Sequence, residues 1–215
     1  MNIYFISGLA ADSRVFKHIR VPAGYNIVHL DWLSPLPQES VGAYALRMAQ
    51  RIDTSQPFAL LGLSFGGMLA AEIALKFAPV KTILLSSVPV YRELPPYYRL
   101  AGITGIHKLL PVAWFKKAAL LKRLFTTETE EDKDMLRQLI RDSDTHFITW
   151  AIDAIVKWKG GGAGFPYIHL HGTRDEVLPF RFTRPTHKIT GAGHLMVMNR
   201  AEELNAIIAA FLGTP

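Results

Sequence analysis

The chain has 215 residues with a formal net charge of +6, and 49% of its residues are hydrophobic. This length suits a single domain with room for an insertion, and this composition excludes a wholly disordered chain. The sequence contains no cysteine, which excludes a disulfide framework, a thiolate zinc site and a cysteine nucleophile. We find neither a signal-peptide pattern nor an apolar run long enough to span a bilayer, so we expect a cytoplasmic protein.

Strand-like and helix-like stretches alternate along much of the chain. Runs rich in β-branched and aromatic residues predict strands at 2–7, 26–30, 57–63, 81–86, 167–171 and, with a weaker pattern, 186–190. Apolar residues spaced by three or four positions, or runs rich in Ala and Leu, predict helices at 40–52, 65–77 and 201–212. This alternation predicts an α/β protein with a mostly parallel central sheet of about six strands, flanked by helices.

Residues 88–165 interrupt the alternation. They open with the Pro-rich stretch "VPVYRELPPYY" and end with "KGGGAGF". Between these, 129–132 resembles a capping box that starts one helix, and 144–158 has the apolar spacing of another. We therefore predict a core formed by residues 1–87 and 166–215, with a helical insertion at 88–165.

Ser64 stands where the strand at 57–63 meets the helix at 65–77, in the sequence "GLSFGG". Gly62-x-Ser64-x-Gly66 matches the nucleophile-elbow pattern, in which a serine occupies a strained turn between strand and helix. Its neighbours two positions away must lack bulk, or the strand and helix would collide. The alternative is that Ser64 only caps the helix.

An acid and a base follow two later strands. Asp175 lies in "HGTRDEVLP", directly after the strand at 167–171, and His194 ends "GAGH", just before the last helix. A serine nucleophile needs a base, and the base needs an acid that orients it. The chain order Ser64, Asp175, His194 is that of α/β-hydrolases. Glu176 is the rival for the acid.

Four stretches together resemble the α/β-hydrolase superfamily: "SGLAADSRVF", "GLSFGG", "HGTRDEVLP" and "GAGH". The resemblance covers nearly the whole chain and implies a short member whose insertion serves as a cap. It implies the strand order 2-1-3-4-5-6. It also implies that the backbone amides of Phe65 and Leu9 form the oxyanion hole, with Ala10 as the alternative to Leu9. Many members carry His-Gly before this donor, whereas this chain carries Ser7-Gly8.

These residues predict a serine hydrolase that cleaves a carboxylic ester or thioester of a small or acyl-chain substrate. Acyl transfer, carbon–carbon bond hydrolysis and a non-catalytic binding protein on the same scaffold remain as alternatives. We expect no metal and no organic cofactor, because no motif for one occurs. We also expect no nucleic-acid partner, and the sequence does not indicate the oligomeric state.

Several further residues have two interpretations. Residues 94–127 carry six Lys or Arg and no Asp or Glu. This predicts an insertion that packs over the pocket, with docking on an anionic membrane surface as the less favoured alternative. His169 and His171 share a strand face, and we favour a structural role over a metal pair. Glu72 and Asp153 are expected to be surface charges on helices.

Overall fold

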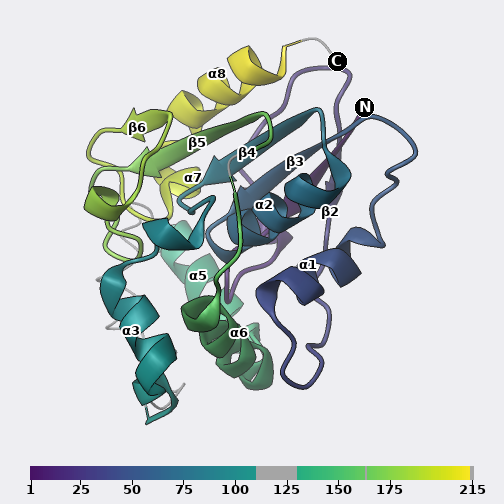
Figure 1. Cartoon of the computed structure of the whole chain (residues 1–215). Coiled ribbons are helices and arrows are strands. Elements are labelled where there is room, and N and C mark those ends of the chain that lie inside the picture. Colours follow the sequence, from purple (N-terminus) through teal and green to yellow (C-terminus); the bar gives the residue numbers. More distant parts are fainter. Residues whose placement is uncertain (110–129, 163, 214–215) are drawn as a thin grey trace.

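The computed structural model describes residues 1–109, 130–162 and 164–213. In these residues, six parallel strands form one sheet in the order β2-β1-β3-β4-β5-β6 (Figure 1). The strands are β1 (Asn2–Ile6), β2 (Asn26–His29), β3 (Phe58–Leu63), β4 (Lys81–Leu85), β5 (Tyr167–Gly172) and β6 (His187–Ile189). The α/β class, the parallel sheet and the strand order expected from the sequence are therefore confirmed.

Helices cover both faces of this sheet. Their described members are α1 (Val41–Ala49), α2 (Phe65–Phe77), α7 (Met196–Asn199), α8 (Ala201–Leu212) and the 3-10 helices η1 (Ser13–Phe16) and η5 (Phe180–Phe182). Tyr4 and Ile6 of β1 join a buried cluster with α1 and α2, whereas Ile3 and Phe5 join a second cluster with η1, α7 and α8. This alternation follows from the two-residue period of a strand, and burial on both faces is typical of parallel sheets.

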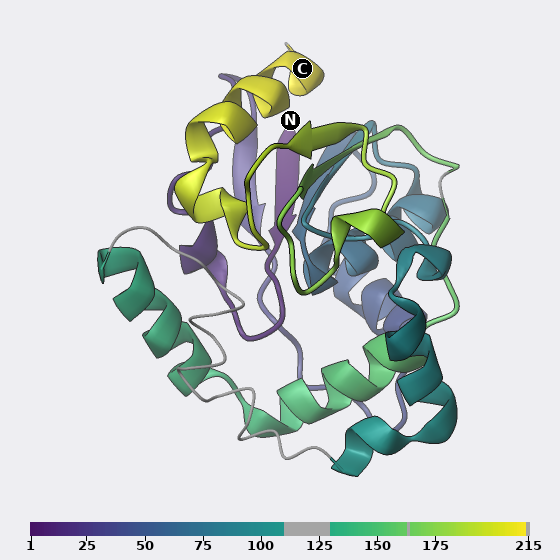
Figure 2. The same cartoon turned by 90° about the vertical axis from the view of Figure 1, so that its left-hand side faces the viewer.

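Between β4 and β5 the chain forms a set of helices. They are η2 (Tyr91–Glu93), α3 (Pro96–Thr104), η3 (Ile106–Leu109), α5 (Glu130–Asp142) and α6 (Thr145–Lys157). Figure 2 shows α3, α5 and α6 together beyond one end of the strands. The predicted capping box includes Thr129, which lies outside the described residues, as does most of the basic stretch at 94–127. The division into core and insertion stays a prediction.

The helices α5 and α6 pack against different parts of the core. Phe147 of α6 belongs to the cluster that contains α1 and α2. Trp150, also on α6, donates from Nε1 to the backbone oxygen of Glu39 at 2.9 Å. Leu136 and Leu139 of α5 belong to the other cluster. The helices α5 and α6 are therefore part of the hydrophobic core, each in a different cluster.

Ion pairs also join α5 to η1 and the residues that follow it. The Lys17 ammonium lies 2.7 Å from Asp132 and 2.9 Å from Glu131, and Arg14 lies 3.0 Å from Asp142. Asp132 is buried, so its pairing offsets a desolvation cost that an exposed carboxylate does not have. No helix in the described residues is both long enough and apolar enough to cross a membrane.

Candidate active site

Ser64 lies at the abrupt turn between β3 and α2. Its φ of 52° and ψ of −117° are a strained backbone conformation for a residue other than glycine. A Cβ on Gly62 would lie 2.4 Å from the backbone oxygen of Gly66, and one on Gly66 would lie 2.2 Å from that of Ile6. Both glycines are therefore required by close packing of backbone against backbone. The Ser64 side chain makes no capping hydrogen bond to α2, so the helix-cap interpretation does not hold.

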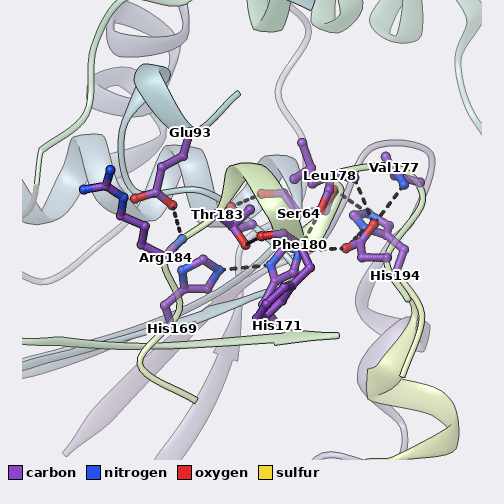
Figure 3. A network of polar contacts seen from close by, with 12 residues as sticks. Ser64, Glu93, His169, His171, Val177, Leu178, Phe180, Thr183, Arg184 and His194 are labelled. Atoms are coloured by element: carbon purple, nitrogen blue, oxygen red, sulfur yellow. Dashed lines mark hydrogen bonds and ion pairs between the residues drawn. The ribbon is translucent and has the colours of Figure 1, made fainter. Parts of the chain in front are cut away.

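The structure brings together the three side chains singled out from the sequence. Ser64 Oγ lies 2.9 Å from His194 Nε2, and His194 Nδ1 lies 2.8 Å from Asp175 Oδ2. Figure 3 shows Ser64 and His194 in this network. Because the carboxylate accepts only, Nδ1 carries the hydrogen and Nε2 accepts the serine proton. This is the geometry in which a histidine can act as a general base toward a serine hydroxyl.

Asp175 is held by its own turn. Its Oδ1 accepts hydrogen bonds from the backbone amides of Val177 and Leu178, both at 2.9 Å. Burial by itself would raise the pKa of Asp175, but the charge of His194 and hydrogen bonds from His171 and His194 hold that pKa well below its usual range. The carboxylate is thus ionised at neutral pH. The neighbouring Glu176 is exposed and is not the acid that contacts His194.

The turn that carries Asp175 and the loop that carries His194 are fixed to each other. The backbone amide of Arg174 donates to the oxygen of Ala192 at 2.9 Å. A Cβ on Gly172 would lie 2.3 Å from that same oxygen. Glycine at this position therefore allows the two loops to cross closely at the carboxyl ends of β5 and β6.

The two predicted oxyanion donors lie beside Ser64. Phe65 is the first residue of α2, where backbone amides have no acceptor within the helix. Leu9 follows Gly8, and a Cβ on Gly8 would lie 3.4 Å from the Ser64 Cβ. Leu9, Ala10 and Phe65 all line the same cavity as Ser64. Amides near the nucleophile can stabilise an oxyanion, but which of Leu9 and Ala10 donates stays a prediction.

A cavity of about 850 Å³ opens onto Ser64 and His194. Its described wall combines loops at the end of the sheet with side chains of α3, α5 and α6, and most of these side chains are apolar. The aromatic residues Tyr97 and Tyr98 of α3 and Trp150 of α6 line it. A pocket of this size and character suits a small molecule with an apolar part.

Two charges expected on helix surfaces are half-buried, and each also contacts a distant part of the chain. Glu72 accepts hydrogen bonds from Trp158 Nε1 at 2.6 Å and from the Gly161 amide at 2.9 Å. Asp153 lines the cavity and lies 2.8 Å from His107 Nε2. These partners come from distant parts of the chain, and no local sequence signal indicates them.

His169 and His171 lie next to each other on β5, as their spacing predicts. His169 Nε2 is 3.1 Å from His171 Nδ1, and both side chains are fully buried. Across the described residues, no group of three or more His, Cys, Asp and Glu side chains is arranged to hold a metal ion. The pair therefore belongs to a hydrogen-bonded network (Figure 3).

Solved structures share this fold over almost the whole chain. MenH from S. aureus has a TM-score of 0.74 at 17% identity, covering 99% of this chain and 93% of that one. A thermophilic esterase from Thermogutta terrifontis has a TM-score of 0.75 at 18% identity, with 99% and 89% covered. The enol-lactonase from Burkholderia xenovorans has a TM-score of 0.70 at 17% identity, with 98% and 90% covered. At such identities the likeness establishes the fold alone.

No curated protein matches the sequence of this chain. A family model does: that of the alpha/beta hydrolase family matches residues 3–207. That match spans nearly the whole sequence. The chain belongs to the alpha/beta hydrolase family.

Proposed function

We propose that the protein is a serine hydrolase that cleaves a carboxylic ester or thioester through an acyl-enzyme. The hydrogen-bonded series Ser64–His194–Asp175 at the wall of an apolar cavity carries this proposal. A binding protein has no need for an aligned base and a buried acid behind a serine that lines its pocket. The series also stands on a strained turn, a feature that clusters at active sites.

In the proposed reaction, Ser64 Oγ attacks the substrate carbonyl while His194 Nε2 takes its proton. Asp175 keeps the hydrogen on His194 Nδ1 and stabilises the imidazolium that forms. The amides of Phe65 and Leu9 donate to the oxyanion of the tetrahedral intermediate. His194 then protonates the leaving alcohol or thiol, and water releases the acyl group by the same route.

The cavity supports a substrate with an apolar acyl or alcohol part. Its volume of about 850 Å³ lies within the range of small-molecule pockets, roughly 300 to 1,000 Å³. The Trp150 ring of α6 packs against the Tyr44 ring at a tilt, with centroids 4.5 Å apart, and donates a hydrogen bond to the Glu39 backbone, so this part of the wall is fixed. Two of the structural neighbours are named an esterase and an enol-lactonase, and a lactone is a cyclic ester. The mechanism requires no cofactor, and the cytoplasmic location stays a prediction.

Labelling with a fluorophosphonate probe tests the proposal without knowledge of the substrate. We expect the wild-type protein to be labelled at Ser64, with the modified peptide identified by mass spectrometry, and Ser64→Ala to remain unlabelled. A folded wild type that the probe does not modify would refute the proposal and favour a binding protein. If labelling succeeds, acyl esters of graded chain length with alcohol acceptors present would separate hydrolysis from acyl transfer.

A further inference from the structure

A second histidine contacts the carboxylate of Asp175. His171 Nε2 lies 3.2 Å from Asp175 Oδ2 and 2.7 Å from the backbone oxygen of Leu178. Both of these neighbours are acceptors, so Nε2 carries a hydrogen, which is donated to the Leu178 oxygen and also faces Asp175 Oδ2 at the longer distance. Figure 3 shows His171 lying between His169 and His194. One carboxylate oxygen therefore faces two imidazoles.

The ring of His171 is itself held in place. Its other nitrogen, Nδ1, is hydrogen-bonded to His169 Nε2 at 3.1 Å. The two rings are perpendicular, and their centroids are 5.1 Å apart. Burial, followed by the neighbouring His171, lowers the pKa of His169 to about 3, so His169 is neutral. The pair thus forms a rigid support that starts at His169 on β5 and ends at Asp175.

Packing alone does not explain polar rings at these positions. Both rings are fully buried, and burying a polar ring costs free energy unless its hydrogen bonds are made. Two amides already hold Oδ1 of Asp175 within its turn. The contact from His171 adds a donor on Oδ2, the same oxygen that accepts from His194.

We propose that His171 is a positioning residue for Asp175, fixing the oxygen that orients His194 and the turn that carries it. This rests on the proposed function, because it matters to catalysis only if His194 serves Ser64. When His194 gains a proton, Asp175 Oδ2 must remain at Nδ1 to stabilise it. A donor from the sheet keeps that oxygen from turning toward the pocket.

Two substitutions at one position separate this role from packing. In His171→Gln the amide nitrogen reaches the place of Nε2 and still donates to Asp175. In His171→Asn the shorter amide reaches only the place of Nδ1 and meets His169 instead. We expect His171→Asn to lower kcat by about 10- to 100-fold with KM changed by less than about 3-fold, and His171→Gln to remain within about 5-fold of the wild type. His169→Phe removes the hydrogen-bond partner of His171 Nδ1 but leaves the contact from Nε2 to Asp175, so we expect it to lower kcat less than His171→Asn does.

A second readout does not depend on turnover. The hydrogen between His194 Nδ1 and Asp175 should give a far-downfield proton NMR resonance in the wild type and in His171→Gln, and a shifted or broadened one in His171→Asn. A folded His171→Asn with wild-type kcat and an unchanged resonance would overturn the proposal. Equal losses of kcat in His171→Asn and His171→Gln would overturn it too, since they would indicate disturbed packing. If the wild type is not labelled at Ser64, the proposed function fails. The NMR resonance of the hydrogen between His194 and Asp175 then tests by itself whether His171 positions Asp175.

Discussion

Replacing Asp175 by Asn is the sharpest test of the assignment of the acid. The Asn Oδ1 can still accept from the amides of Val177 and Leu178, so the turn keeps its shape. Its NH₂ group, however, now faces His194 Nδ1. An amide hydrogen there forces the ring hydrogen onto Nε2, which then cannot take the proton of Ser64.

The size of the effect follows from these contacts. Loss of the correct tautomer in such a triad lowers the rate by roughly 1,000- to 10,000-fold, or about 4–5 kcal/mol of transition-state stabilisation. The substitution should affect the stability of the fold less than the rate. His171 Nε2 loses Asp175 Oδ2 as an acceptor but keeps the backbone oxygen of Leu178 at 2.7 Å, so we expect a loss of about 1–2 kcal/mol in the free energy of unfolding.

The assay is the second-order rate of fluorophosphonate labelling, which needs no known substrate. Glu176→Gln is the matched control, because it neutralises the adjacent, exposed carboxylate on the same loop. We expect it to stay within about 3-fold of the wild type. The reasoning is refuted if Asp175→Asn labels within 10-fold of the wild-type rate, or if Glu176→Gln loses as much as Asp175→Asn.

Three further predictions concern the elbow, the buried histidine and α5. Gly66→Ala should abolish labelling and lower the unfolding free energy by more than about 3 kcal/mol, since its Cβ would lie 2.2 Å from the oxygen of Ile6; a labelled variant with wild-type stability would contradict this. Burial lowers the pKa of His169 from 6.5 to about 3 in the folded state. Between these two pH values the unfolded chain binds one more proton than the folded protein, so the free energy of unfolding decreases as the pH is lowered. The wild type should therefore lose roughly 2 kcal/mol more than His169→Phe between about pH 7 and about pH 5 in urea unfolding, and equal losses would exclude a neutral His169. Lys17→Met should lower stability by about 1–3 kcal/mol, because the buried Asp132 loses the ammonium at 2.7 Å; Glu131→Gln, which changes an exposed partner of Lys17, should alter it little, and similar losses in both would contradict the argument.

The sheet and the three candidate residues could be predicted because their signals are local. Each strand is a short apolar run, and Ser64, Asp175 and His194 each follow a strand within a Gly-containing loop. In a parallel sheet such loops meet at one edge. Composition and spacing were therefore enough to indicate a shared site, while the strand order came from the resemblance.

The side-chain contacts of the helices between β4 and β5 could not be predicted in this way. The contact of Glu72 with Trp158 joins residues 86 positions apart, and that of His107 with Asp153 joins residues 46 positions apart. Both depend on how the helices between β4 and β5 pack against the core, which the apolar spacing of each helix alone does not determine. The link from His171 to Asp175 is close in sequence, but it requires the side-chain directions of a strand and a turn together.

The length of chain between β4 and β5 has a consequence for how the protein folds. Strands β1 to β4 and the turn at Ser64 come from residues 1–85, whereas β5 pairs with β4 only after residues 86–166 have closed into a loop. Closing a flexible loop of that length costs roughly 4 kcal/mol of chain entropy, and non-local pairing of this kind slows folding. We therefore predict that the nucleophile turn forms before the acid and base are in place, since both of these come from the last 41 residues (175–215). On refolding, secondary structure should recover in an early phase, while reactivity at Ser64 returns only with the later docking of β5 and β6.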